Sequence, residues 1–259
     1  RLMQAYAAAH DYSHLFIIRG EIITPSFLDF FSENNINATK VLYEWDSIKN
    51  CNYLSIIKYF NNVYTFDRND AEKYDLSYQP LFYVPNKNNS PSICSTEKSI
   101  DLLFIGSLHG DRFDILTKLI KQYSSRLNLY FYLYVPVLVY FKILLLKGTY
   151  IPWSRVQFKP LNYSDVVELT LNSKAVLDLS SPGQDGITMR TFEVLSTNTK
   201  LITSNSRILE ESFYRKNIVQ LFDKKTCRLD LDFIKSDSIK EILKLDISSL
   251  SVWLQRLGL

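Results

Sequence analysis

The sequence has few of the residues that build disulfide, redox or metal sites. Its 259 residues include only three cysteines and three histidines. Cys51, Cys94 and Cys227 are odd in number and have no metal or redox spacing, so a reducing, cytoplasmic setting fits best. The histidines are too scattered for a histidine-built metal site, and no Asp-x-Asp motif follows a predicted strand. The cysteines and histidines therefore predict no metal site of their own, and we expect no required cofactor.

Glycine is also scarce, with seven residues and no Gly-x-Gly-x-x-Gly fingerprint, which disfavours an NAD-dependent oxidoreductase. The net charge of +3 is too small to argue for a nucleic-acid partner, and we expect none. No signal-peptide pattern is present. The first residue is arginine and not methionine, and we expect that an upstream piece of the protein is missing.

Apolar runs long enough to cross a membrane are missing as well. The longest candidate, residues 129–146, is interrupted by Pro136 and Lys142, whereas a spanning helix needs about 20 apolar residues. One interpretation is a buried strand followed by a helix. The other is a surface helix that touches lipid. In that case the lipid contacts would be Tyr140, Phe141, Leu144 and Leu145, with Lys142 and Lys147 near headgroups.

What the sequence does contain is a repeated alternation of short apolar runs with helical patterns, typical of α/β proteins with parallel sheets. The predicted strands cover residues 15–18, 40–43, 63–66, 78–83, 100–105, 127–135, 156–158, 176–179, 201–203 and 217–222. The predicted helices cover residues 24–31, 52–60, 71–74, 112–123, 165–171, 188–195, 231–234, 239–245 and 250–257, with Thr24, Ser164 and Thr188 as caps.

A stretch rich in Asn, Ser and Pro, residues 86–98, predicts a linker between two domains. We expect an N-terminal, acceptor-side domain over residues 1–92 and a C-terminal, nucleotide-binding domain over residues 93–240. Residues 241–259 are expected to form a C-terminal helix that packs back on the first domain.

Polar residues follow each of the first three predicted strands, as the pairs Arg19/Glu21, Glu44/Asp46 and Asp67/Asp70. The carboxyl ends of parallel strands share one edge of a sheet, and that edge is where ligands bind. A carboxylate there could act as a general base. Asp46 is the first candidate, Glu21 the second and Asp67 the third. The alternative for each is a helix cap or a partner for Arg19 or Arg68.

A second polar stretch lies between two predicted strands of the second half and carries Gln184, Asp185, Gly186 and Thr188 before a helix. Arg190 and Glu193 are three residues apart on that helix and so share a face. Arginine binds phosphate oxygens with two donors, and a carboxylate can accept both ribose hydroxyls. The alternative is a simple ion pair within the helix.

Gly106 and Ser107 follow the strand over residues 100–105 and precede a helix, which predicts a tight turn. Such a turn lets the backbone approach a diphosphate near a helix N-terminus, with His109 and Arg112 as further donors. The alternative is a turn without a ligand.

These segments together resemble the GT-B glycosyltransferases, specifically those related to CgeB-like proteins and to bacterial capsule and lipopolysaccharide biosynthesis transferases. The resemblance rests on residues 18–21, 43–47, 64–68, 104–107, 184–193 and 201–205. It implies two Rossmann-like domains that face a cleft, with a nucleotide sugar, most simply a UDP-sugar, on the C-terminal domain. It also implies that the first strand of the N-terminal domain is missing from this chain.

The resemblance assigns the ribose to Glu193 and the phosphates to Arg190, with no obligatory metal. Arg190 would also stabilise the leaving diphosphate. The acceptor would be a glycan or a lipid-linked glycan, and the enzyme would work in the cytoplasm, with peripheral contact to the inner face of the membrane. Two alternatives stay open. One is a CMP-Kdo-type transferase, for which Lys159, Arg112 and Arg190 would supply cations. The other is a non-catalytic scaffold that binds sugar or nucleotide.

Overall fold

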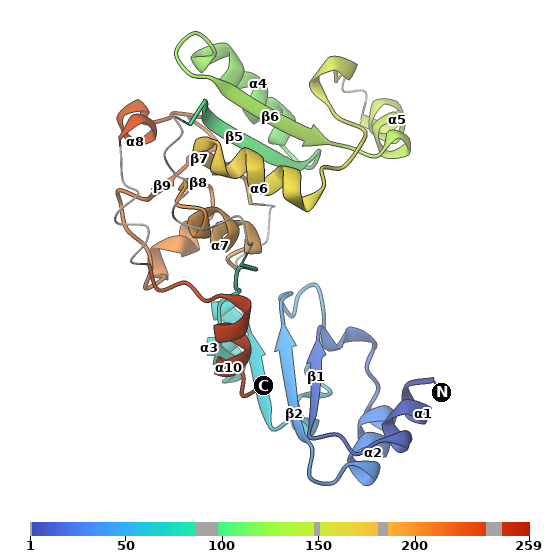
Figure 1. Ribbon diagram of the computed structural model, residues 1–259. Coiled ribbons are helices and arrows are strands. Elements are labelled where there is room, and N and C mark those ends of the chain that lie inside the picture. The colour runs from blue at the N-terminus through green and yellow to red at the C-terminus, as the bar shows by residue number, and fades with distance from the viewer. Residues whose placement is uncertain (1, 86–97, 148–150, 181–185, 237–244) are drawn as a thin grey trace. The chain divides into compact units, whose positions relative to one another are not determined.

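The computed structural model describes residues 2–85, 98–147, 151–180, 186–236 and 245–259. These residues form two compact units, each with its own parallel sheet (Figure 1). Among the described residues, unit 1 comprises 2–83, 186–189 and 248–259, and unit 2 comprises the remainder. The linker expected over residues 86–98 and the helix expected over residues 239–245 fall mainly outside the described residues.

Unit 1 contains a four-stranded sheet in the order β1-β2-β3-β4. All neighbouring strands are parallel. Its elements are α1 (Leu2–Ala9), β1 (His14–Ile18), the 3-10 helix η1 (Gly20–Ile22), α2 (Pro25–Asn34), β2 (Thr39–Glu44), the 3-10 helix η2 (Ile57–Tyr59), β3 (Asn62–Thr65), α3 (Arg68–Tyr74), β4 (Ser77–Tyr78) and α10 (Leu250–Arg256).

The two faces of this sheet follow from the two-residue period of its strands. Ile17 of β1 lies opposite Leu42 of β2, and both pack with Leu28 of α2 in one buried cluster. Helix α2 begins where the sequence predicts, because Pro25 occupies its first turn and Thr24 Oγ1 accepts a hydrogen bond from Phe27 N at 3.3 Å.

The other face of the sheet is covered by Trp253 from α10. Its side chain is 1% exposed. Its ring centroid lies 4.6 Å from that of Tyr43 and 4.5 Å from that of Phe82. Its indole nitrogen donates to the Pro80 carbonyl at 3.1 Å, which satisfies the one polar group of the ring. A residue near position 250 thus completes a core built mainly by residues before position 84.

Unit 2 contains a five-stranded parallel sheet in the order β6-β5-β7-β8-β9. Its elements are β5 (Ile100–Ser107), α4 (Arg112–Tyr123), β6 (Leu129–Tyr134), α5 (Val137–Lys147), the 3-10 helix η4 (Trp153–Arg155), α6 (Tyr163–Leu171), β7 (Ser173–Asp178), α7 (Met189–Ser196), β8 (Lys200–Thr203), the 3-10 helix η5 (Ser206–Glu210), β9 (Val219–Leu221) and α8 (Leu231–Lys235).

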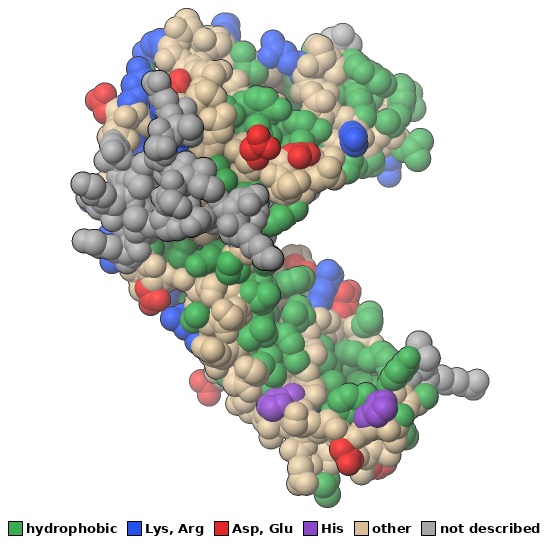
Figure 2. All heavy atoms as spheres, viewed as in Figure 1, with side chains coloured by type: hydrophobic (Ala, Val, Ile, Leu, Met, Phe, Trp, Pro, Cys, Tyr) green, Lys and Arg blue, Asp and Glu red, His purple; other side chains and the backbone are tan. Residues whose placement is uncertain are grey.

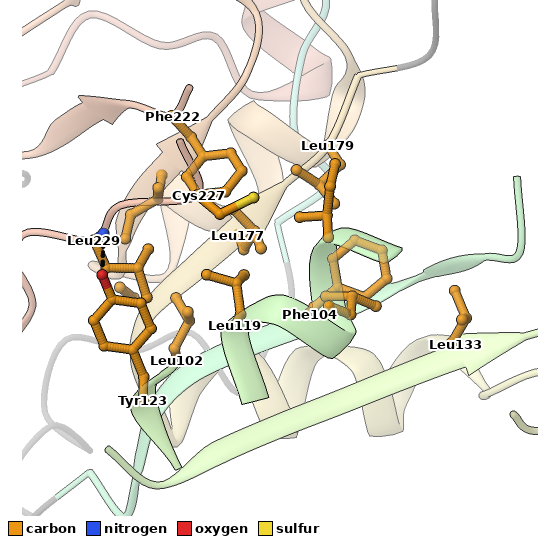
Figure 3. Packing of buried hydrophobic residues seen from close by; sticks show 14 of the residues in the cluster. Leu102, Phe104, Leu119, Tyr123, Leu133, Leu177, Leu179, Phe222, Cys227 and Leu229 are labelled. Atoms are coloured by element: carbon orange, nitrogen blue, oxygen red, sulfur yellow. Dashed lines mark hydrogen bonds between the residues drawn. The ribbon is translucent and has the colours of Figure 1, made fainter. Parts of the chain in front are cut away.

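The core of unit 2 lies between this sheet and helices α4 and α8 (Figure 3). Leu102, Leu119 and Leu177 are buried there, each at most 1% exposed. The hydroxyl of Tyr123, at the edge of the cluster, accepts a hydrogen bond from Leu229 N at 3.0 Å. No helix among the described residues has both the length and the apolarity to cross a bilayer.

Most predicted elements are confirmed, and α4 has the predicted bounds. The helix expected over residues 52–60 is wrong. That segment forms turns and the three-residue η2. Tyr53 and Ile56 are both buried against β1, β2 and α2, so an irregular segment fills the core that a helical face would have covered. The strand expected over residues 156–158 is reduced to one bridge, between Tyr134 and Gln157.

The three predicted helix caps differ in their outcome. Thr24 is confirmed, whereas Asn162 and not Ser164 occupies the cap position of α6. Thr188 precedes α7, but its hydroxyl is buried and makes no hydrogen bond within the described part of the chain. Gly106 and Ser107 are the last residues of β5, paired with Leu133 and Tyr134, so they form no tight turn. Sheet pairing extends the strand two residues beyond its apolar run.

Candidate functional site

The first turns of α7 hold Arg190 and Glu193 on one face, as predicted. Arg190 Nη1 lies 3.6 Å from Glu193 Oε2, and the two side chains are 21% and 25% exposed. That separation exceeds the 2.7–2.9 Å of a charge-assisted hydrogen bond. The ion pair of the alternative interpretation therefore exists but is loose. Burial raises the pKa of Glu193, and Arg190 partly opposes this effect.

A small pocket of about 10 Å³ between α6 and α7 is lined in part by this pair. Its lining includes Tyr163 and Val166 from α6 and Ser196 from α7. Burial, followed by the Glu193 carboxylate, raises the pKa of the Tyr163 hydroxyl. Tyr163 was not among the predicted site residues. Its only sequence signal is its position at the first turn of a helix.

Polar residues that follow β5, β7, β8 and β9 gather at the carboxyl edge of the second sheet. We call Arg112, Ser180, Ser204 and Lys224 the strand-end cluster. Ser180 N donates to Ser204 Oγ at 3.0 Å, and Lys224 Nζ donates to the Ser180 carbonyl at 2.7 Å. Lys224 was missed in the sequence. It follows β9, so the rule applied to the other strand ends would have found it.

The side chain of Arg112, a predicted donor-binding residue, links the ends of β5 and β7. Its Nη2 donates to the Leu179 carbonyl at 2.7 Å and its Nη1 to the Ser107 carbonyl at 3.0 Å. A Cβ at Gly106 would lie 2.8 Å from the Phe104 ring and 3.4 Å from Arg112 Nη1. The glycine therefore has a packing reason that needs no ligand.

Of the four predicted residues that precede α7, Gln184 and Asp185 lie outside the described residues. A Cβ at Gly186 would lie 2.2 Å from the ring of Phe66, within unit 1. Close approach to an aromatic ring therefore requires glycine at this position. Thr188 contributes a buried hydroxyl with no hydrogen-bond partner in the described part of the chain.

In unit 1 the structure brings both leading general-base candidates together at Arg19. The guanidinium lies 3.0 Å from Glu21 Oε2 and 3.4 Å from Asp46 Oδ2. Asp46, and next Glu21, raise the pKa of Arg19. Arg19 has a φ of 63°, a left-handed conformation that is uncommon for arginine, and its backbone nitrogen donates to the Tyr43 carbonyl at 3.0 Å.

The carboxylate that the sequence-based ranking passed over is Glu44. Its side chain is 0% exposed, and its Oε1 accepts a hydrogen bond from Gly20 N at 2.6 Å. Cys51 Sγ lies 3.7 Å from its Oε2 and donates to it. Burial raises the pKa of Glu44 to about 7, against the lowering effect of these two donors. The signal was the two-residue period, which places Glu44 on the same face as the buried Leu42.

The third predicted pair has structural roles. Asp67, the third base candidate, caps α3, since its Oδ1 accepts hydrogen bonds from Asn69 N at 2.9 Å and Asp70 N at 3.3 Å. Asp70 Oδ2 accepts one from Ile48 N at 2.7 Å, and burial raises its pKa. In the described ranges, no group of three or more His, Cys, Asp or Glu residues is arranged to hold a metal ion.

No family model and no curated protein sequence matches the chain. Solved structures do match. An α-glucosyltransferase in complex with UDP and a 13-mer DNA matches 95% of this chain and 79% of its own, at 12% identity and a TM-score of 0.63. The lipopolysaccharide outer core galactosyltransferase WaaB matches 99% of this chain and 77% of its own, at 12% identity and a TM-score of 0.52.

A third match is a structure described as a putative UDP-N-acetylglucosamine 2-epimerase from Listeria monocytogenes. It covers 99% of this chain and 75% of its own, at 11% identity and a TM-score of 0.53. All three matches extend over both parallel sheets. The chain has the GT-B fold. Within the GT-B fold, the Arg190–Glu193 face and the strand-end cluster belong to unit 2, and the Arg19 group belongs to unit 1. At identities near 12% the matches establish the fold, and a fold can carry more than one reaction.

Proposed function

We propose that the protein is a glycosyltransferase that moves a sugar from a nucleotide sugar, with UDP as its nucleotide, to a glycan or lipid-linked acceptor. The observation that carries the proposal is the Arg190–Glu193 pair of α7. A cation and a carboxylate stand 3.6 Å apart, both partly exposed, without closing on each other. A nucleoside diphosphate presents the complementary groups, namely phosphate oxygens and a ribose diol.

In this proposal Glu193 accepts the ribose hydroxyls and Arg190 binds the phosphates and stabilises the leaving diphosphate. The remaining donor contacts are assigned to Gly106, Ser107, Arg112, Gln184, Asp185, Gly186 and Thr188, to which we add Lys224. We assign a second phosphate to Lys224, because it lies beside Ser180 at the end of the central strand β7 and its ion pair with Asp111 is long, at 3.7 Å.

Transfer with inversion needs a base for the acceptor hydroxyl. We assign that role to Asp46, with Glu21 as second choice, because Asp46 directly follows β2 at the carboxyl edge of the sheet and is partly exposed there. Charge on the leaving group is balanced by arginine and lysine, so the proposed reaction needs no metal. We place the reaction in bacterial surface-polysaccharide synthesis, in the cytoplasm and with peripheral contact to the inner face of the membrane.

The test is a screen of UDP-, GDP- and CMP-sugars that scores nucleotide release with and without acceptors, in buffer containing EDTA. Nucleotide release that depends on a glycan or lipid-linked acceptor and proceeds in EDTA is the expected result. Preference for CMP-Kdo would favour the acidic-sugar alternative. Binding of nucleotide without turnover of any donor would favour a scaffold.

Two further outcomes correspond to the matched structures. Acceptor-independent release of UDP with an epimerised sugar would assign an epimerase reaction to the same fold. Glucose transfer to a DNA duplex, included as one acceptor, would contradict the glycan assignment. Acceptor-dependent sugar incorporation, followed by mass spectrometry, separates these outcomes.

A further inference from the structure

Helix α5 is apolar on nearly every side, yet part of it faces solvent. The helix runs from Val137 to Lys147, and its charged residues are Lys142 and Lys147. A helix of this composition is normally buried all round. Here Leu138 is 84% exposed and Leu145 83% exposed. Figure 2 shows hydrophobic side chains gathered over the end of unit 2 that carries α5.

The helix is anchored to unit 2 by its opposite side. Tyr140, which was expected to touch lipid, is 3% exposed, and its hydroxyl donates to the Ile151 carbonyl at 2.6 Å. Its ring packs edge-on against Trp153 of η4, and Phe141 also contacts that indole. Ile143 and Leu144 pack on the core. The exposed face therefore consists of Leu138, Phe141 and Leu145, with Val137, Val139 and Trp153 beside them.

The sequence on either side of this helix carries charge of one sign. The fifty residues from 115 to 164 contain no Asp or Glu at all. They contain seven basic residues: Lys118, Lys121, Arg126, Lys142, Lys147, Arg155 and Lys159. The six whose side chains are described are all exposed. In a chain with a net charge of only +3, the sequence that contains α5 is thus strongly basic.

An open pocket adjoins η4. It has a volume of about 220 Å³ and has apolar walls that include Phe113, Leu116 and Phe131 next to polar ones that include Arg155. Trp153 and Arg155 both belong to η4, so one short helix contributes to the exposed face and to the pocket. Apolar walls beside a guanidinium match the chemistry of an anionic phospholipid.

We propose that α5 and η4 dock unit 2 onto a bilayer that carries anionic phospholipids. The exposed face, which we call the docking face, enters the boundary between headgroups and acyl chains, and the basic side chains attract the lipid phosphates. Aromatic and lysine side chains with apolar stems suit this boundary. Eleven residues span roughly 16 Å as a helix, too short to cross a hydrocarbon core of about 30 Å, so the contact is peripheral.

A second copy of the chain is a poorer occupant. A twofold dimer through the docking face would bring two acid-free, basic segments together, and like charges repel. The proposal specifies the membrane contact placed in the preceding section. It does not depend on glycosyl transfer, because vesicle binding is measured without donor or acceptor.

The experiment is flotation of the full chain with phosphatidylcholine vesicles, with and without about one third phosphatidylglycerol. Binding should require phosphatidylglycerol and be lost at about 1 M salt, where charges are screened within a few ångströms. Leu138→Ser should weaken binding about tenfold, because it removes most of one buried leucine. Its matched control is Ile36→Ser, a residue 86% exposed in unit 1. Lys142→Glu should also weaken binding about tenfold, against Lys216→Glu as the control.

Circular dichroism verifies that each variant is folded. Equal binding to both vesicle types, or equal effects of the variants and their controls, would overturn the proposal. A wild-type dimer in solution that Leu138→Ser converts to a monomer would identify a second copy as the occupant. A chain that transfers sugar without binding vesicles would leave the proposed reaction intact and refute this inference alone.

Discussion

The two units use the same parallel architecture but treat their polar strand ends differently. In unit 1, the carboxylates after β1, β2 and β3 are nearly all tied to neighbouring groups. Glu44 and Asp70 hold backbone N–H groups, and Asp67 caps a helix. In unit 2, Arg190 and Glu193 are joined by one long ion pair on a partly buried face of α7.

This difference shows that a charged residue at a strand end is not by itself a site. What matters is how much of its hydrogen-bonding capacity the fold has already used. By that measure Asp67 and Asp70 are structural, Glu193 can still accept a ligand, and Asp46 lies between them. The following substitutions test this ranking.

Asp46→Asn should have the largest effect, since a lost general base costs roughly 10²- to 10⁴-fold in rate. Transfer, followed by nucleotide release, should fall by about a thousandfold while donor affinity stays unchanged. Glu21→Gln, which alters the other partner of Arg19, should cost far less. A wild-type rate for Asp46→Asn would mean that Asp46 serves only as an ion-pair partner of Arg19. It would then be structural, like the other carboxylates of unit 1.

Glu44→Gln tests the most deeply buried carboxyl group. Because its folded pKa of about 7 lies above its unfolded value, the folded state holds a proton that the unfolded state has lost between about pH 4.5 and pH 7. The free energy of unfolding should therefore fall by about 3 kcal/mol across that range as the pH rises. Glutamine keeps an oxygen for Gly20 N and carries no charge, so the variant should lose this dependence.

Urea unfolding of the wild type and of Glu44→Gln near pH 5 and pH 8 measures both effects. The variant should be the more stable of the two at the higher pH. An unchanged slope with pH would mean that another group is responsible. Asp70, whose pKa is also raised, is the first to examine by Asp70→Asn.

Glu193→Ala should weaken UDP binding about a hundredfold, because a charged acceptor for two ribose hydroxyls is lost. Calorimetry with UDP measures the affinity. Glu168→Ala, an exposed glutamate on neighbouring α6, controls for the change in net charge. Equal UDP affinities for the wild type and Glu193→Ala would mean that Glu193, like Asp67, has only a structural role.

Arg112→Ala should have the smallest effect, a loss of about 1.5 kcal/mol in the free energy of unfolding, since its two hydrogen bonds to the Ser107 and Leu179 carbonyls disappear. Lys118→Ala, on the exposed side of the same helix, should be neutral. If UDP affinity fell while stability did not, Arg112 would serve only as the proposed donor contact and not also as a link between the two strands.

Helices and strands could be predicted where a single hydrophobic periodicity ends at a clear change in sequence. Helix α4 has four buried residues at helical spacing and ends before a polar stretch, so its limits could be predicted. The segment over residues 52–60 has helical spacing too. It folds as turns, because long-range packing of Tyr53 and Ile56 decides its conformation. Local patterns carry no information about that packing.

The site was predictable to the same extent. That Arg190 and Glu193 lie together could be predicted because i and i+3 positions share a helix face, a strictly local relation. Tyr163 and Lys224 reach their neighbours from other elements, the second across 44 residues to Ser180. Gly106 was expected to approach a phosphate, and the structure adds a second reason for glycine there, because a Cβ would lie 2.8 Å from the Phe104 ring. A glycine indicates that another group lies close to the backbone, but the sequence alone does not identify that group.

The position of Trp253 has a consequence for biosynthesis. The ribosome makes the strands of unit 1 first, but the indole that fills their second face emerges only after all of unit 2, 173 residues beyond Pro80. We expect unit 2 to fold while the chain is still being made. Until Trp253 is made, Tyr43 and Phe82 of unit 1 stay exposed to water. The first-made unit is thus the last to mature, and in the interval its open aromatic face is a natural target for chaperones.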